Sequence, residues 1–286
     1  MHSLEDFLKI DIHYHANPDL YLRRHTALIA GKTYADYQSA VVLTSHLGST
    51  AVQAIMAQEL GYPVLGSLVM NQIAGGLDFR IILRALLEYR TLIPARLLVH
   101  FPTITGRQYT SRLSRELTKP NFAKQSMQPV TLFNESHQLK AEVKEIIRLA
   151  ANEPIVLSTG HAGPDEIYAV VEEIERFSQV KLLINQPAHP LTKLNAAALI
   201  ELAKNEHVFF EQTTLTYLLG YQDEHDFAQV LQQVPRLIYS SDLGQLSQMD
   251  IHQYMLTSEN YFKQFALSDD RKQDICKNNP VRLLSL

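Results

Sequence analysis

The residues best suited to metal chemistry in this sequence are two histidines near its start. The stretch Asp11-Ile12-His13-Tyr14-His15 ends a short apolar run that begins at Leu8. In a β-strand alternate side chains point to the same side, so Asp11, His13 and His15 are expected to share one face. Two imidazoles at positions i and i+2 at the end of a strand can bind one cation. The pair alone is weak evidence, because such pairs also occur by chance in loops.

Three later apolar runs end in side chains of the same kinds. One ends in Ser158-Thr159-Gly160-His161, another is followed by Ala188-His189, and the last ends in Ser240-Ser241-Asp242. In a closed parallel barrel the ends of the strands meet at one rim, which would bring these donors close to the first pair. Imidazoles with one carboxylate suit zinc, or manganese, iron or nickel with additional waters. The sequence therefore predicts a metal site built from His13, His15, His161, His189 and Asp242.

Eight short runs rich in Val, Ile and Leu are expected to carry these residues as strands. They cover residues 8–15, 40–45, 64–71, 95–103, 155–161, 180–186, 208–213 and 237–242. Amphipathic segments fill the gaps, at 50–60, 79–89, 135–151, 164–178, 191–205 and 223–233, and a helical tail follows from Met249. Alternating strands and helices form right-handed βαβ units around a parallel sheet. We expect one α/β domain over residues 1–286, a (β/α)₈ TIM barrel with a C-terminal helical extension.

The connection after the fourth expected strand, residues 104–134, is too long for an ordinary loop between a strand and a helix. It carries Arg107, Arg112, Arg115, Lys119 and Lys124 against the single acid Glu116. One interpretation is a solvated surface insertion. The other is a lid at the active-site rim, in which Arg107, Arg112 and Arg115 bind an anionic substrate.

Composition narrows the class of protein. The chain has 286 residues, 46% of them hydrophobic, which is ample for a full core and excludes a disordered chain. Its net charge of −4 argues against binding to nucleic acid or to an acidic membrane surface. The lone Cys276 excludes a disulfide framework and any cysteine-rich metal site. Neither a signal peptide nor a membrane-spanning stretch is evident, so we expect a cytoplasmic protein. The composition leaves open whether the chain forms a homo-oligomer.

These motifs together resemble those of metal-dependent hydrolases of the amidohydrolase superfamily, and more closely its uncharacterised barrel proteins. The resemblance covers nearly the whole chain. It rests on residues 11–15, Asn17-Pro18-Asp19, Asn71, residues 74–78, His100-Phe101-Pro102-Thr103, residues 158–161 and residues 240–245. It implies that His13, His15, His161, His189 and Asp242 hold one or two metal ions, and that Asp242 accepts a proton from the activated water.

The sequence departs from that superfamily at the fourth strand. Members with two metals usually bridge them with a carboxylated lysine or a glutamate there, whereas this strand reads Leu97-Leu98-Val99-His100-Phe101. His46, Glu211 and His100 remain candidates for a second metal site or for supporting the first. One ion, with zinc as the first choice, is therefore favoured over two.

The chemistry implied is the hydrolysis of an amide, lactone, ester or phosphoester bond in a small, anionic substrate. Asp242 would take the proton of the water, and a histidine such as His189 would polarise the substrate or protonate the leaving group. The missing bridge keeps a decarboxylase with one metal as an alternative. A barrel that binds a metabolite without catalysis is a further, weaker alternative.

Overall fold

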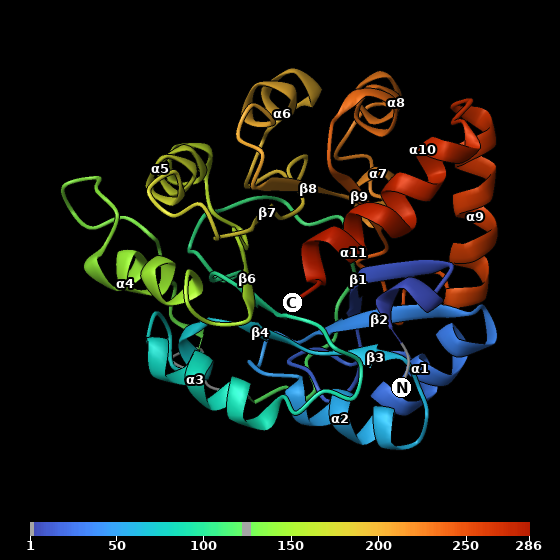
Figure 1. Ribbon diagram of the computed structural model, residues 1–286, viewed down its shortest axis with the longest axis horizontal. Coiled ribbons are helices and arrows are strands. Elements are labelled where there is room, and N and C mark those ends of the chain that lie inside the picture. The colour runs from blue at the N-terminus through green and yellow to red at the C-terminus, as the bar shows by residue number, and fades with distance from the viewer. Residues whose placement is uncertain (1–2, 122–126) are drawn as a thin grey trace.

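A computed structural model describes residues 3–121 and 127–286, and confirms the parallel α/β barrel (Figure 1). Its strands are β1 (Lys9–His15), β2 (Ser39–Thr44), β3 (Val64–Leu65), β4 (Ser67–Val69), β5 (Leu97–His100), β6 (Ile155–Ser158), β7 (Leu182–Ile184), β8 (Val208–Thr213) and β9 (Leu237–Ser240). β3 and β4 are two halves of the third barrel strand, separated by Gly66. Neighbouring strands pair in parallel in the order β1-β2-β3 and β4 through β9.

The barrel closes between its first and last strands. The Asp242 N–H donates to the His13 carbonyl at 2.8 Å, and the His15 N–H donates to the Leu243 carbonyl at 2.8 Å. On the other side the Ser67 hydroxyl of β4 donates to the Leu43 carbonyl of β2 at 2.6 Å. The residues just beyond β1 and β9 are thus held side by side, which places the first and last candidate ligands at one point of the rim.

Helices surround the strands, as Figure 1 shows. They are α1 (Ala27–Asp36), α2 (Ala51–Glu59), α3 (Phe79–Glu88), α4 (Ala141–Ala150), α5 (Pro164–Ile174), α6 (Ala196–Leu202), α7 (Thr214–Leu218), α8 (Glu224–Gln233), α9 (Ile251–Gln264), α10 (Asp269–Gln273) and α11 (Asn279–Leu284). Short 3₁₀ turns add η1 (Leu4–Asp6) and η2 (Gln72–Ala74), and a π-helical segment, η4 (Asp274–Asn278), joins α10 to α11. None of the helices in the described part of the chain is long and apolar enough to span a membrane.

The sequence did not predict α1. Its pattern is weak because Gly31 and Thr33 are poor helix formers. Gly31 has a packing reason, since a Cβ atom there would lie only 3.0 Å from the Cβ of Tyr62. The Thr26 side chain accepts the N–H of Ile29 and so caps the start of the helix.

Two apolar layers make up the core. The inner layer fills the barrel with one or two side chains from most strands: Ile10, Ile12, Ala40, Val42, Leu65, Leu98, Val156, Leu183, Phe209 and Ile238. Leu4, Phe7, Leu283 and Leu284 extend this layer, and the Arg96 N–H, just before β5, donates to the Leu284 carbonyl at 2.7 Å. The amino ends of the strands are therefore covered by η1 and α11, and the opposite ends remain for a site.

A β-bulge in β1 corrects the expected direction of Asp11. Asp11 pairs with Val41 and Tyr14 with Leu43, so three steps along β1 match two along β2. The extra residue lets both Ile12 and His13 face the barrel interior, the first in the apolar layer and the second in the cavity above it. Asp11 faces the helix layer instead, where it accepts the Tyr34 hydroxyl of α1. It does not share a face with His13 and His15.

The long connection after β5 lies at the carboxyl ends of the strands. The Arg112 N–H donates to the Tyr221 hydroxyl at 2.7 Å, and the Leu22 N–H donates to the Glu116 carbonyl at 2.9 Å. The Ser247 hydroxyl donates to the Ser114 carbonyl at 3.0 Å. Three other loops of the rim therefore hold residues 112–116. Lys124 lies outside the described residues.

Candidate metal centre

A cavity opens at the carboxyl ends of the strands. Its inner wall is formed by histidines and one carboxylate, and arginines and tyrosines approach from the loops. The lining includes His13, His15, His46, His100, His161, His189, Asp242, Arg23, Arg115, Tyr109 and Tyr221. All of the histidines singled out in the sequence therefore face one space.

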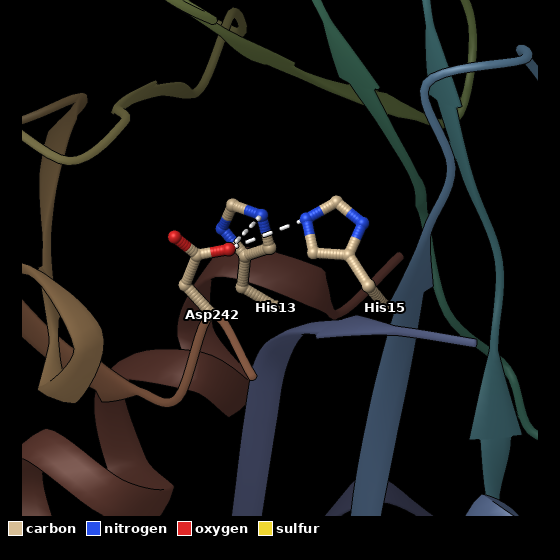
Figure 2. A group of neighbouring side chains, drawn as sticks. All are labelled: His13, His15 and Asp242. Carbon is tan, nitrogen blue, oxygen red and sulfur yellow. Dashed lines mark ion pairs between the residues drawn. The ribbon is translucent and has the colours of Figure 1, made fainter. Parts of the chain in front are cut away.

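Three side chains on β1 and just beyond β9 form the most compact group in this cavity. The Nε2 atoms of His15 and His13 lie 3.2 and 3.5 Å from Oδ1 of Asp242. Figure 2 shows the two imidazoles and the carboxylate facing one another. The three donor atoms lie within 4.8 Å of one another, and both histidines are buried. This spacing suits three ligands of one divalent ion.

A buried carboxylate lies behind His13. Glu211, from β8, accepts from His13 Nδ1 at 3.0 Å and from the Ser240 hydroxyl at 2.7 Å. Its other oxygen accepts the Gln186 N–H at 3.1 Å. With its proton on Nδ1, His13 presents the lone pair of Nε2 to the cavity, which is the form that binds a metal. Glu211 therefore orients His13 in this arrangement rather than offering a free oxygen to a second ion.

Asp19 supports His15 and His46 in the same way. Its Oδ2 lies 3.5 Å from His15 Nδ1 and 3.3 Å from His46 Nδ1. Arg23 contributes Nε at 2.7 Å to the same oxygen, which neutralises the buried charge. His15, Asp19 and His46 form a second compact group of metal-binding residue types. In the sequence Asp19 stands out only as part of Asn17-Pro18-Asp19, one of the segments that carry the family resemblance. By itself an aspartate after Asn-Pro is typical of a turn.

Gln186 is a further residue of the site that sequence reasoning did not assign. Its side-chain amide donates to Oδ2 of Asp242, and its backbone N–H donates to Glu211. Both Gln186 and Asp242 have positive φ angles, 42° and 51°, which are uncommon for residues with a side chain. Backbone strain of this kind often collects at functional sites. Gln186 leaves Oδ1 of Asp242 facing the histidine pair.

Burial and charge act on these groups in opposite directions. Burial favours neutral His13, but the carboxylates of Glu211 and Asp242 outweigh it and raise the pKa of His13 to about 9. Burial also favours the neutral acid at Asp242, but His13 and His15 hold the pKa of that carboxyl below its usual range. Burial lowers the pKa of His46 and of His189 to about 4. The metal-free centre thus combines one charged imidazole with an ionised carboxylate.

His161 and His189 lie on the other side of the cavity. Their ring centroids are 4.5 Å apart, and neither belongs to the two compact groups found among the described residues. The Leu191 N–H donates to His189 Nδ1 at 3.2 Å. This contact puts the proton of neutral His189 on Nε2, which makes Nε2 a hydrogen-bond donor. That tautomer suits contact with a substrate better than the expected metal ligation.

His100 ends β5 at the position where a bridging residue was sought. Its ring centroid lies 5.8 Å from that of His13, and its Nε2 is buried without a hydrogen-bond partner among residues 3–121 and 127–286. Nδ1 of His15 faces Asp19 instead, 3.5 Å from its Oδ2. Buried polar atoms normally have partners, so His100 Nε2 is available to a bound group.

The three expected substrate-binding arginines differ in position. Arg115 lines the cavity, where its Nη2 donates to the Tyr109 hydroxyl at 3.1 Å. Arg107 instead pairs with the buried Glu166 at 2.6 Å, and Arg112 donates to the carbonyls of Leu219 and Gly220 at 2.9 and 2.8 Å. Of these three arginines Arg115 alone lines the cavity, and Arg107 and Arg112 hold the loop in place.

Comparison with known proteins places the chain in a family. Residues 9–211 match the model of a family of unknown function, DUF6282. The chain belongs to this family. The match runs from β1 to Glu211 and ends before β9, so it includes both first-strand histidines but not Asp242. Among curated proteins there is no match.

Two solved structures share the fold of this DUF6282 protein. A probable 2-pyrone-4,6-dicarboxylic acid hydrolase from Acinetobacter baumannii, with citric acid bound, is 14% identical over 97% of this chain and 99% of its own, with a TM-score of 0.55. An uncharacterised TIM-barrel protein from Bordetella bronchiseptica is 11% identical over 96% of this chain and 98% of its own, with a TM-score of 0.51. Both likenesses support the TIM-barrel fold over the full length.

The donor set of this DUF6282 protein fits a divalent metal ion. Two imidazole nitrogens and one carboxylate oxygen converge, and a carboxylate stands behind each imidazole. Metal-binding histidines usually have such a partner on the second ring nitrogen. The three protein ligands leave room for a further ligand from solvent or substrate, as in catalytic rather than structural zinc sites.

Proposed function

We propose that this protein is a metal-dependent hydrolase of the amidohydrolase superfamily that acts on a small anionic substrate. The observation that carries the proposal is the convergence of His13, His15 and Asp242 at the carboxyl end of the barrel, with Glu211 and Asp19 behind the two histidines. The carboxyl end is where TIM-barrel enzymes have their active sites.

His13, His15 and Asp242 would hold the metal, with one ion favoured over two because Arg23 already neutralises Asp19. Zinc suits these ligands best, and manganese, iron or nickel are the alternatives. When bound, such an ion acts as a Lewis acid and lowers the pKa of water from about 15.7 to about 7.

The surrounding side chains would orient the substrate and move its protons. His189 lines the cavity with its proton on Nε2, so it could donate to a carbonyl oxygen or to the leaving group. Arg115 would bind an anionic group of the substrate. Its Nη2 donates to the Tyr109 hydroxyl at 3.1 Å, which holds the guanidinium at the cavity. The dicarboxylic acid in the name of the Acinetobacter protein, and the citric acid bound to it, agree with an anionic substrate. Asp242 would accept the proton of the attacking water.

One observation favours a decarboxylase as the second candidate. The amide of Gln186 donates to Oδ2 of Asp242, so this oxygen is engaged and less basic than a free carboxylate oxygen. Hydrolysis requires a proton acceptor for water, whereas loss of carbon dioxide from an acid does not. A weak proton acceptor at Asp242 therefore suits decarboxylation better than it suits hydrolysis.

The test is metal stoichiometry on the purified protein, followed by a panel of lactones, amides, phosphoesters and aromatic acids. We expect about one transition metal per chain, and activity that His13→Ala and Asp242→Asn remove. Release of carbon dioxide without uptake of water would replace the hydrolase by the decarboxylase. A protein that binds no metal, or variants with full activity on the substrate found, would refute the proposal.

A further inference from the structure

One carboxylate outside the cavity contacts both strands that carry the candidate ligands. Oδ1 of Asp11 accepts the N–H of His13 at 3.0 Å and the N–H of Ser241 at 3.1 Å. Its Oδ2 accepts the hydroxyl of Tyr34, on α1. Asp11 is 4% exposed and does not line the cavity. It therefore binds the peptide group of one candidate ligand and that of the residue preceding another.

The bulge explains why this carboxylate is needed. The extra residue of a bulge is left without a partner in the ladder, and here Asp11 supplies the acceptor for the N–H of His13. Ser241 follows the end of β9, and its N–H donates to the same oxygen. The Ser241 hydroxyl in turn donates to the His13 carbonyl at 2.9 Å, and the Asp242 N–H donates to that carbonyl at 2.8 Å. We call these four residues, Asp11, His13, Ser241 and Asp242, the closure clasp.

We propose that Asp11 is a positioning residue that sets the separation between the His13 imidazole and the Asp242 carboxylate. The inference rests on the proposed function, in which these two side chains bind one ion. Without the carboxylate, two buried N–H groups lose their acceptor, which is costly enough for the bulge to rearrange. Because the bulge turns His13 into the cavity, rearrangement of the bulge would move this candidate ligand. The substituted residue, Asp11, does not itself line the cavity.

The chain offers variants that separate positioning from general stability. Asp11→Ala removes the acceptor, whereas Asp11→Asn keeps an oxygen for the two N–H groups and turns its amide toward the Tyr34 hydroxyl. Tyr34→Phe removes only the contact to α1 and serves as a milder variant should Asp11→Ala fail to fold. Ile146→Ala, on the buried face of α4, is a control that lowers stability away from the clasp.

The first readout is hydrogen–deuterium exchange of metal-free protein in the segments 9–15 and 237–244. We expect Asp11→Ala to raise exchange in both segments, Tyr34→Phe to raise it less, and Asp11→Asn and Ile146→Ala to leave it near the wild type. The second readout is a titration with Co²⁺ alone, followed by its visible spectrum. We expect Asp11→Ala to bind Co²⁺ about 10–100-fold more weakly, and Asp11→Asn to stay within about threefold of the wild type.

The outcomes distinguish this inference from the proposed function. Unchanged exchange in both segments of Asp11→Ala, or a lowered melting temperature with unchanged Co²⁺ affinity, as expected for Ile146→Ala, would overturn the role of Asp11. Should Asp11→Ala not fold, unchanged exchange in Tyr34→Phe would overturn it. A wild-type protein that binds no Co²⁺ would defeat the proposed metal centre, while the exchange measurement would still decide whether Asp11 holds the clasp.

Discussion

Replacing Glu211 with glutamine should weaken metal binding in a way that depends on pH. Glu211 is fully buried, and all three of its contacts are with donors: His13 Nδ1, the Ser240 hydroxyl and the Gln186 N–H. A glutamine in its place must turn its amide toward one of these donors. The loss of one acceptor should cost about 1–3 kcal/mol of stability.

Two effects on metal affinity then oppose each other. The pKa of His13 is about 9, so at pH 7 about 1% of His13 is in the neutral form that can bind a metal. This proton competition costs about 2.7 kcal/mol at pH 7 and vanishes above pH 9. Without the Glu211 charge the pKa of His13 should fall by about 1–3 units, which relieves the competition. Loss of the carboxylate behind the imidazole should weaken binding by about 10–100-fold at every pH.

The assay is a competition titration of zinc against a chelator from pH 6 to 9.5. For the wild type we expect the affinity to rise about tenfold per pH unit up to pH 9, because metal binding displaces one proton from His13. For Glu211→Gln the rise should end about 1–3 units lower, with a plateau about 10–100-fold below that of the wild type. Near pH 7 the two proteins should differ by less than about tenfold.

Glu173→Gln provides the matched control, because Glu173 is a buried glutamate that pairs with Arg176 on the outer layer, 3.2 Å away. It should follow the wild-type curve. The reasoning is refuted if Glu211→Gln rises with the same slope to the same pH as the wild type, because the charge of Glu211 would then not hold the proton on His13.

Three further predictions concern stability in acid, the KM for the substrate and stabilisation by zinc. The pKa values of His46 and His189 are about 4, against about 6.5 in an unfolded chain, so the unfolded chain binds more protons between these values. The free energy of unfolding of metal-free protein should therefore fall as the pH drops from 6.5 to 4, by up to about 3 kcal/mol per histidine; denaturant titrations with a flat profile would contradict this. Arg115→Met should raise KM for the substrate found in the panel by about 10–100-fold with a smaller change in kcat, whereas Arg112→Met should not; equal effects would remove Arg115 from the substrate site. Zinc at about 100 times its Kd should stabilise the protein by about 2.7 kcal/mol, an effect that a chelator reverses and that is absent in His13→Ala; a melting temperature insensitive to zinc would count against the site.

The sequence predicted the strands well because each is a short run of branched apolar residues between polar segments. Residues 208–213 were predicted with the bounds that β8 has, residues 40–45 were shifted by one residue from β2, and the other runs were predicted too long at one or both ends. The excess lay mostly at the carboxyl ends, as at residues 101–103 and 159–161, where polar and glycine residues leave the ladder to form the rim. Most of these rim residues are still buried, so the character of the sequence changes only gradually where the ladder ends.

The direction predicted for the Asp11 side chain was wrong for a different reason. Strict alternation places Asp11 with His13, and the bulge between them breaks that alternation. The bulge depends on contacts with Ser241 and Tyr34, which are distant in the sequence. A local pattern does not contain this information.

Asp19 and Gln186 could not be assigned from the sequence because their importance lies in what they contact. Asp19 has the signature of a turn residue, and Gln186 is an amide in the short segment before Pro187. Each becomes part of the site only when the barrel brings it against His15 and His46, or against Asp242.

The closure of the barrel has a consequence for how the chain folds. The contact between Asp11 and Ser241 joins residues 230 positions apart, among the most distant pairs in the protein. Because closing so long a loop is slow, pairing of β1 with β9 is expected late in folding. Until then both strands are open edges, ready to pair with other chains. His13 and Asp242 are also apart until that moment, so an ion held as proposed would not organise the early chain. It would be bound only by the closed barrel, and any change that slows closure prolongs the time during which the chain can aggregate.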